Sequence, residues 1–228
     1  MIRAVIFDFN GVLIDDEHVH FQLFQEVLAQ EGVAITDRDY HDKYLGLDDR
    51  GCFEAALADA GRAELPAAYV DELIARKARR YFEVAEGGLR VFPGAPEAIT
   101  ALAGAYAMAI NSGALRPEIE FSLGRMGVRD RVAYIVSAED ADRCKPDPMG
   151  YLLALEGLRR EVLPDLAASE CLVFEDSLAG IQSALAAGMR AVGVSNTYND
   201  AELRGVGADD VLPGLVDLGP AWVDGRFR

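Results

Sequence analysis

Short apolar runs that end in polar residues recur along this chain, with helical stretches between them. The first run, residues 2–9, is broken only by Arg3 and by Asp8 near its end, and the turn Asn10-Gly11 follows it. Similar runs cover residues 106–110, 134–136, 171–174 and 191–194, and helical patterns cover residues 96–102, 118–126, 148–158 and 178–187. Strands that lack polar alternation are typical of a sheet buried on both faces. Strands alternating with helices therefore predict an α/β fold with a doubly wound parallel sheet.

Residues 16–86 interrupt this rhythm between the first and second strands. They carry helical patterns, for example over residues 21–28, and no convincing strand. A simple crossover connection needs far fewer residues. We therefore predict a small α-helical domain inserted over residues 16–86, and a core domain formed by residues 1–15 and 87–228.

The charge and the cysteine content exclude several classes of protein. The chain has 38 acidic against 22 basic residues, a net charge of −16, which disfavours nucleic acids and anionic membranes as partners. No apolar run approaches the length of a membrane span. Cys52, Cys144 and Cys171 are scattered, so neither a disulfide framework nor a zinc site is indicated, and buried thiols are expected. We expect a cytoplasmic protein, either a monomer or a weak homodimer.

Polar residues at the ends of the predicted strands suggest phosphoryl chemistry. Ligands of open parallel sheets bind outside the carboxyl ends of the strands, where this chain has Asp8, Ser112 and the pair Glu175-Asp176, with Lys145 in a nearby loop. Three converging carboxylates favour a bound Mg²⁺, a hydroxyl and an ammonium can hold phosphate oxygens, and an aspartate can attack phosphorus. Each residue alone could instead form a turn or cap a helix.

Four motifs in this order make a specific pattern that covers most of the chain. The pattern resembles the haloacid dehalogenase-like hydrolase superfamily, and an insert directly after the first motif is similar to the helical cap of its β-phosphoglucomutase and phosphoglycolate phosphatase branch. The resemblance implies a Rossmann-like core with a helical cap. The motifs are Asp8-Phe9-Asn10-Gly11-Val12, Asn111-Ser112-Gly113, Lys145-Pro146-Asp147-Pro148 and Phe174-Glu175-Asp176-Ser177 with Ala179-Gly180-Ile181.

The resemblance also implies a role for each matching residue. Asp8 would be the nucleophile. The Mg²⁺ ligands would be Asp8, the backbone carbonyl of Asn10, Asp176, and Glu175 directly or through water. The phosphate would be bound by Ser112, the amide of Gly113 and Lys145.

Residue 10 departs from the family pattern. The family usually has a second aspartate there, which protonates the leaving group and then activates water, a contribution of roughly 10²–10⁴-fold in rate. Asn10 cannot transfer a proton, although its carbonyl can bind metal. Three interpretations stay open: a phosphatase that uses good leaving groups or borrows Asp15, Asp16, Glu17 or a cap residue as the acid; a phosphate-binding relative with little activity; and a variant in which the aspartate has been replaced.

Substrate contacts are expected from the inserted domain. By resemblance, Gly46 and Arg50 lie on a loop that dips into the active site, where Arg50 could bind a carboxylate or a second phosphate or could simply be solvated. His20 could orient a group near residue 10 or serve as a structural hinge residue. Lys77 is expected on a solvated helix face.

Three related chemistries are less favoured. A dehalogenase needs no Mg²⁺ and so leaves Glu175-Asp176 unexplained. A phosphonatase needs a cap lysine, for which Lys43 and Lys77 have weak support. A mutase typically has a lysine where this chain has Leu45. We therefore predict a magnesium-dependent phosphatase that acts on a small phosphorylated metabolite, such as a sugar phosphate or a phosphoglycolate-like compound.

Overall fold

The chain divides into two compact units in the computed structural model, which describes residues 1–45 and 47–227. One unit joins Met1–Asp15 to Val91–Arg228, and the other is the inserted segment Asp16–Arg90. The assignment of these units as a catalytic core and a substrate cap stays a prediction.

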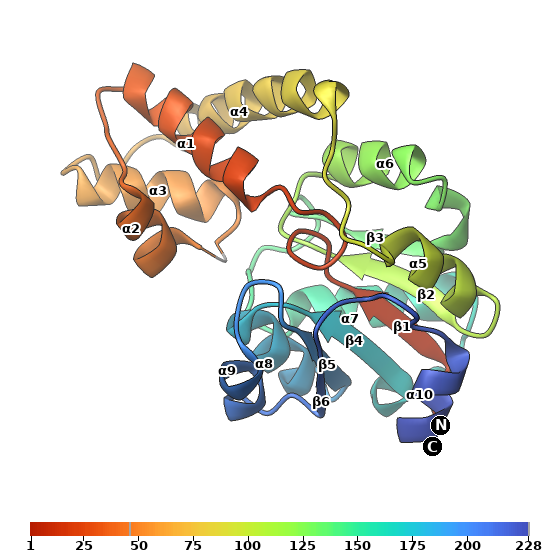
Figure 1. Ribbon diagram of the computed structural model, residues 1–228. Helices are drawn as coiled ribbons and strands as arrows, with labels where there is room; N and C mark the ends of the chain where they lie inside the picture. Colours follow the sequence, from red (N-terminus) through yellow and green to blue (C-terminus); the bar gives the residue numbers. More distant parts are fainter. Residues whose placement is uncertain (46, 228) are drawn as a thin grey trace. The chain divides into compact units, whose positions relative to one another are not determined.

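The larger unit is built on a six-stranded parallel sheet with the strand order β3-β2-β1-β4-β5-β6 (Figure 1). The strands are β1 (Ala4–Phe7), β2 (Ala107–Asn111), β3 (Tyr134–Val136), β4 (Cys171–Glu175), β5 (Arg190–Val194) and β6 (Asp210–Leu212). The predicted α/β fold with a Rossmann-like, doubly wound parallel sheet is confirmed. The sequence prediction missed β6, because this partly exposed edge strand has only three residues, of which only Val211 and Leu212 are apolar.

Helices cover both faces of the sheet. They are α5 (Ala95–Ala103), α6 (Arg116–Arg125), α7 (Met149–Glu161), α8 (Leu178–Ala186), α9 (Asp200–Gly205) and α10 (Pro220–Arg226). Ile6 and Val173 belong to a core cluster shared with α7, α8 and α9. Strand side chains alternate between faces, so Phe7 and Phe174 point the other way, where their rings stack 5.1 Å apart and Trp222 of α10 lies 6.1 Å from Phe174.

The order of the strands determines where a ligand can bind. The chain runs from β1 outward to β2 and β3, and then returns to place β4 on the other side of β1. In open α/β sheets, ligands bind at such a switch point, outside the carboxyl ends of the strands. Phe7 is in register with both Ile110 and Phe174. The next residues along these three strands are Asp8, Asn111 and Glu175.

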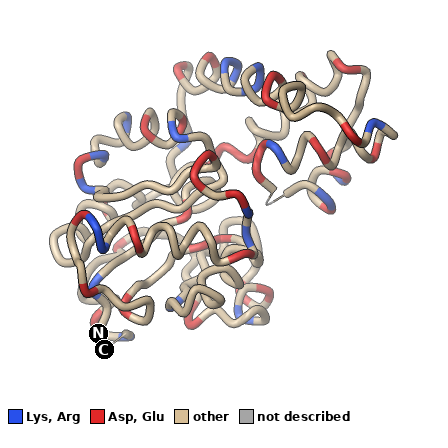
Figure 2. The backbone as a smooth tube through the Cα atoms, turned by 180° about the vertical axis from the view of Figure 1, so that it is seen from behind, with Lys and Arg blue, Asp and Glu red and all other residues tan. Residues whose placement is uncertain are grey.

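The second unit is helical. Its elements are α1 (Glu17–Gln30), α2 (Asp37–Asp39), a π-helical turn η1 (Tyr40–Tyr44), α3 (Asp49–Asp59) and α4 (Ala67–Gly87). Its own apolar core includes Phe24, Phe53 and Leu73, and the rings of Phe24 and Phe53 meet edge to face at 5.0 Å. Acidic and basic residues are interspersed along its helices (Figure 2), and pairs such as Arg76 with Glu31 link them.

Two expectations about single residues are wrong. Lys77, expected on a solvated face, is fully buried inside the helical unit. Cys144 is exposed, whereas Cys52 and Cys171 are buried as expected. Among the described residues, no helix combines the length and the apolar character that a membrane crossing requires.

Candidate active site

Asp8 is the first residue after β1, and its side chain is almost fully buried. Its backbone N–H donates to the carbonyl oxygen of Phe174 at 3.0 Å, so the pairing of β1 with β4 continues past the end of the strand. All four residues of β1 are buried. The carboxylate therefore projects from a rigid element, which positions a functional group better than a free loop does.

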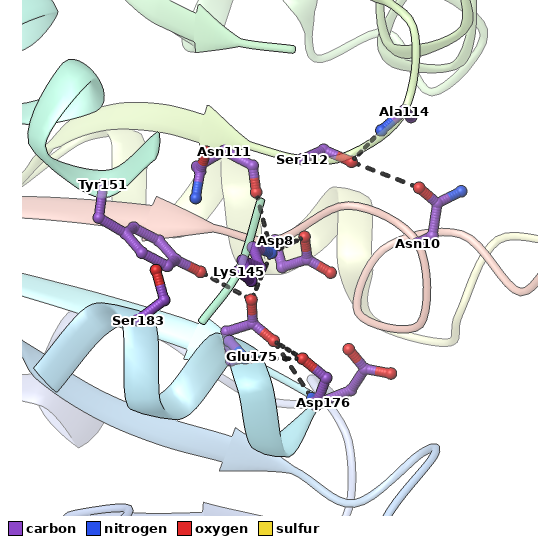
Figure 3. Close-up of polar contacts among 12 residues, drawn as sticks. Asp8, Asn10, Asn111, Ser112, Ala114, Lys145, Tyr151, Glu175, Asp176 and Ser183 are labelled. Atoms are coloured by element: carbon purple, nitrogen blue, oxygen red, sulfur yellow. Dashed lines mark hydrogen bonds and ion pairs between the residues drawn. The ribbon is translucent and has the colours of Figure 1, made fainter. Parts of the chain in front are cut away.

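Lys145 connects the ends of β1 and β4 (Figure 3). Its ammonium donates to Asp8 Oδ1 at 2.6 Å and to Glu175 Oε1 at 2.5 Å. It also lies 3.4 Å from the carbonyl oxygen of Asn111 and 5.5 Å from the ring centre of Tyr151. One cation thus bridges the predicted nucleophile and the acidic end of β4.

Glu175 accepts hydrogen bonds on both carboxylate oxygens and is completely buried. Oε1 accepts from Lys145 and from the hydroxyl of Tyr151 at 2.8 Å, and Oε2 accepts from the backbone N–H of Ser177 at 3.2 Å and from its hydroxyl at 2.9 Å. Gly180 leaves the space for this side chain, because a Cβ there would lie 1.9 Å from Oε1. Glu175 is therefore fixed in one orientation.

Asp176 lies between two segments of backbone. Its Oδ2 accepts a hydrogen bond from the hydroxyl of Thr197, in the loop after β5. On the other side it packs against Gly11, where a Cβ would lie only 2.0 Å from Oδ2 and where φ is +80°. Glycine is needed at residue 11 both for this close approach and for the left-handed backbone.

The carboxylates of Asp8, Glu175 and Asp176 form a compact cluster. Each offers one oxygen, and these oxygens all lie within 4.8 Å of one another. Three buried carboxylates beside a single lysine leave an excess of negative charge, which is costly unless it is neutralised. Hard oxygen donors of this kind are the ligands that Mg²⁺ takes in proteins. The residues present fit a magnesium ion.

The pKa values in the cluster show the same charge excess. Burial raises the pKa of Asp8, the Lys145 ammonium lowers it and the Glu175 carboxylate raises it, for a value of about 7. Burial, and then the charges of Asp8 and Glu175, raise the pKa of Asp176 well above its ordinary value. Burial lowers the pKa of Lys145, but the two carboxylates outweigh burial and hold this pKa above its ordinary value. A bound divalent cation would favour the ionised carboxylates.

Ser112 and Asn10 meet at the same edge of the sheet (Figure 3). The Ser112 hydroxyl donates to Asn10 Oδ1 at 3.3 Å and accepts from the backbone N–H of Ala114 at 3.0 Å. The backbone N–H of Ser112 donates to Val136 at 3.0 Å and holds the loop against β3. The next residue, Gly113, is exposed. This corner thus offers a hydroxyl, an amide side chain and an accessible stretch of backbone.

The residues predicted to contact substrate from the insert lie in the helical unit. Arg50 of α3 is ion-paired with Asp71 and lies 3.6 Å from Glu54, so it has partners within its own unit. Gly46 lies outside the described residues. The structure therefore brings together the predicted residues of the sheet edge, and the roles of Gly46, Arg50 and His20 stay predictions.

His20 belongs to a buried polar chain in the helical unit. The Lys77 ammonium donates to Asp49 Oδ1 at 2.6 Å and to His20 Nδ1 at 2.7 Å. Because an ammonium can only donate, Nδ1 is the acceptor and Nε2 carries the proton that faces Asp16 Oδ2 at 3.3 Å. The same Oδ2 accepts from the hydroxyl of Tyr81 at 2.6 Å. Lys77 is thus a paired interior cation.

Sequence reasoning missed three side chains that shape the site: Tyr151, Asn196 and Thr197. Tyr151 has the apolar neighbours of a core residue, and nothing in the sequence distinguishes its hydroxyl from that of any buried tyrosine. Asn196 and Thr197 had a usable signal, because they follow the fifth predicted strand at the same edge of the sheet. Ser177 caps α8 by accepting from the backbone N–H of Gly180 at 3.0 Å, and it also holds Glu175.

Comparison with known proteins identifies the family of this chain and several relatives. A family model described as haloacid dehalogenase-like hydrolase matches residues 5–194. The validoxylamine A 7′-phosphate phosphatase of Streptomyces hygroscopicus subsp. limoneus is 31% identical over 230 residues, which cover 96% of each chain.

Two solved structures are similar over nearly the whole chain. The β-phosphoglucomutase of Clostridium difficile has a TM-score of 0.85 at 19% identity, covering 100% of this chain and 97% of that one, and so supports the fold. A variant of CbbY from Rhodobacter sphaeroides with an aspartate replaced by asparagine, in complex with xylulose-1,5-bisphosphate, has a TM-score of 0.80 at 27% identity, with 96% and 97% of the two chains covered.

Proposed function

The chain belongs to the haloacid dehalogenase-like hydrolase family, and from that premise we propose that it is a magnesium-dependent phosphatase that forms an aspartyl-phosphate on Asp8. The match to this family and to a phosphatase relative supports an enzyme of the hydrolase class, a phosphatase. The cofactor, the covalent intermediate and the substrate are the proposal. We take the substrate to be a small phosphomonoester, either a sugar phosphate or a phosphoglycolate-like compound.

The contact between Lys145 and Asp8 carries this proposal. A nucleophile for phosphorus must remain ionised next to an anionic substrate, and a neighbouring cation favours that state. Lys145 lies 2.6 Å from Asp8 Oδ1 and also holds Glu175. It can therefore orient the nucleophile and offset the charge of the incoming phosphate.

The reaction would proceed in two displacements at phosphorus. A carboxylate oxygen of Asp8 forms a bond to phosphorus while the bond to the leaving oxygen breaks, and that oxygen takes up a proton. Water then attacks the same phosphorus and loses a proton, and the electron pair of the bond to Asp8 returns to the carboxylate, which releases inorganic phosphate. The hydroxyl of Ser112 and the amide of Gly113 would orient the phosphoryl oxygens, with Lys145 balancing their charge.

Four residues would hold the magnesium ion. Asp8, Asp176 and the backbone carbonyl of Asn10 would be direct ligands. The protein donors on both oxygens of Glu175 support a contact through water for that residue. When bound, the ion would supply positive charge where negative charge builds up on the phosphoryl group.

A second candidate function is a phosphate-metabolite-binding protein with little turnover, and Asn10 is the observation that favours it. Its amide N–H groups are far too weakly acidic to transfer a proton. Two of the alternative acids suggested by the sequence already have partners in the helical unit, since Asp16 accepts from Tyr81 at 2.6 Å and Glu17 accepts from Tyr40 at 2.5 Å. The asparagine variant of CbbY solved with a sugar bisphosphate supports the idea that such a protein can hold a ligand.

Substrate contacts from the helical unit are proposed for Gly46, Arg50 and His20. Arg50 is partly exposed and ion-paired with Asp71. An exposed pair of this kind is weak, so the guanidinium could exchange Asp71 for a carboxylate or second phosphate on the substrate at little cost.

Phosphate release tests the proposal directly. The parent protein, Asp8→Ala and Asn10→Asp are assayed with and without Mg²⁺ on sugar phosphates, phosphoglycolate and an activated aryl phosphate. We expect magnesium-dependent release from the aryl phosphate, its loss in Asp8→Ala, and a rise of about 10²–10⁴-fold in Asn10→Asp on substrates with poor leaving groups.

A matched control and a mass check make this assay decisive. Asn199→Asp adds the same charge at the cap of α9, where aspartate caps as well as asparagine, and it should leave the rate unchanged. Intact mass must confirm residue 10 in each sample, because an asparagine before a glycine can lose its amide to water. Release no faster than that of Asp8→Ala, on every substrate, would rule out the enzyme proposed and leave the binding protein.

A further inference from the structure

The loop after β5 reaches two separate segments of the candidate site with two adjacent side chains. The Thr197 hydroxyl donates to Asp176 Oδ2, and the Asn196 amide donates to the carbonyl oxygen of Gly11 at 2.7 Å. Gly11 belongs to the turn after β1, and Asp176 follows β4. Two adjacent residues after β5 thus bind the segments after β1 and β4, which carry the proposed magnesium ligands.

We propose that Asn196 and Thr197 are positioning residues that set the affinity of the site for its divalent cation, and we call the pair the 196–197 clamp. The inference rests on the proposed magnesium dependence. It adds a contribution from the end of β5, outside the four sequence motifs. Neither residue needs to touch the ion, because each acts through an atom that fixes a ligand or its backbone.

Thr197 fixes the rotation of the Asp176 carboxylate. That carboxylate packs on Gly11, with Oδ2 only 2.0 Å from the position of an added Cβ, so it cannot shift toward the turn. The Thr197 hydroxyl holds Oδ2 from the side. A carboxylate held in this way presents its other oxygen in a constant direction, and oriented ligands bind metal more tightly than mobile ones.

Asn196 fixes the turn that carries the proposed backbone ligand. The N–H of Gly11 donates to the carbonyl of Ile14 at 2.9 Å, which closes the turn on itself. The Asn196 amide then ties the carbonyl of Gly11, one residue beyond Asn10, to the end of β5. This bond adds an anchor from the end of β5 to a turn that Phe92 also holds, by donating its backbone N–H to the carbonyl of Leu13 at 3.0 Å.

The loop that carries the clamp is itself fixed at both ends. The N–H of Ser195 donates to Leu212 of β6 at 2.8 Å, and its hydroxyl donates to the same carbonyl at 3.2 Å. Asn199 caps α9 by accepting from Glu202 at 3.0 Å. Thr197 is nevertheless exposed, and Asn196 is only half-buried. Substitutions there should therefore leave the fold intact.

Direct metal binding tests the clamp without relying on turnover. Mn²⁺ is titrated into the metal-free protein, and free Mn²⁺ is followed by electron paramagnetic resonance. Thr197→Val keeps the shape and removes the hydroxyl, and we expect it to weaken binding by about 10–100-fold. Thr197→Ser should restore the affinity, and Asn196→Ala should weaken it in the same direction.

A matched threonine and a kinetic measurement complete the experiment. Thr100→Val removes a hydroxyl that bonds Pro96 on α5 and should not change Mn²⁺ binding. In phosphate release, Thr197→Val should raise the Mg²⁺ concentration for half-maximal rate while leaving KM for substrate unchanged at saturating Mg²⁺.

The outcomes separate this inference from the proposed function. If the parent binds Mn²⁺ and Thr197→Val binds it equally well, the clamp is wrong and the phosphatase proposal is untouched. If Thr197→Ser fails to restore binding and unfolds earlier in EDTA, the role of Thr197 is structural and the clamp is again wrong. A parent protein that binds no Mn²⁺ would overturn both.

Discussion

One buried carboxylate should control how the stability of the metal-free protein changes with pH. Asp8 is buried at the end of β1, and its pKa lies near 7 instead of the ordinary 3.8 because burial and the Glu175 charge outweigh the attraction of Lys145. The perturbation is Asp8→Asn, which replaces the carboxylate with a neutral group of the same shape. We compare the unfolding free energy of parent and variant in EDTA.

The sign of the effect follows from which state binds the proton. Below about pH 4 the Asp8 carboxyl is protonated in both the folded and the unfolded chain, so it contributes nothing. Between about pH 4 and 7 only the folded chain keeps the proton, and the unfolding free energy must fall as the pH rises. The difference of about three pKa units corresponds to about 4 kcal/mol, at about 1.4 kcal/mol per unit.

Urea unfolding at 25 °C from pH 4.5 to 8 measures this directly. The parent should lose stability across that range, and Asp8→Asn should lose about 3 kcal/mol less, because the carboxyl of the unfolded chain is already mostly ionised at pH 4.5. Saturating Mg²⁺ should stabilise the parent at pH 8, since cation binding favours the ionised carboxylates, and should stabilise the variant less. Asp130→Asn changes an exposed aspartate and serves as the matched control.

Parallel pH curves for parent and Asp8→Asn would contradict this prediction. That result would mean that Asp8 ionises in the folded chain as it does in the unfolded one. The charge balance around Lys145 would then already be neutral, and the argument that this site needs a divalent cation would lose its electrostatic basis.

Two further predictions use matched pairs. Gly11→Ala should abolish Mn²⁺ binding in the resonance titration, because its Cβ would lie 2.0 Å from Asp176 Oδ2. Gly61→Ala has a similar φ of +78° and nothing within 4 Å, so it should carry only the backbone strain of about 1–2 kcal/mol and should bind Mn²⁺ normally. Normal Mn²⁺ binding by both variants would mean that Asp176 does not need the space at Gly11. Lys77→Met should lower the unfolding free energy measured in urea by about 3–5 kcal/mol, since the variant leaves the buried carboxylate of Asp49 without its cation. Lys43→Met breaks an exposed ion pair and should change the unfolding free energy little. Equal effects of the two substitutions would mean that the burial of Lys77 does not determine its contribution.

The sheet and the grouping of the site could be predicted because both depend on local pattern. An apolar run such as residues 4–7 is typical of a parallel sheet buried on both faces, and parallel strands end at one edge. Asp8, Glu175 and Lys145 therefore had to converge once the strands were recognised. The register of Phe7 with its two neighbours then sets their distances.

Contacts made by single polar atoms could not be predicted in the same way. The spacing of Lys77 gives its helix face, but only the packed helices show that Asp49 and His20 meet it. Thr197 is an exposed residue in a loop, and its partner Asp176 is 21 residues away. Edge strand β6 has only two apolar residues. Each of these depends on tertiary packing, which overrides local preference.

The backbone and the side chain of Asn10 have separate proposed roles at the edge of the sheet. Its backbone belongs to the turn that Gly11 and Asn196 fix, and this part does not depend on the side chain. Its side chain accepts from Ser112 at 3.3 Å and carries no charge. An aspartate at residue 10 would restore a proton donor, and it would also add a fourth carboxylate to a cluster that has one lysine.

The neutral side chain of Asn10, which slows proton transfer, should therefore increase the affinity of the site for an anionic substrate. Like charges near a binding site oppose the entry of a phosphate, whereas an amide can donate a hydrogen bond to it. Asn10→Asp should then raise both kcat and KM in the phosphate-release assay. A variant with higher kcat and unchanged KM would show that residue 10 affects only the proton, and that the charge of the cluster is already balanced when substrate binds.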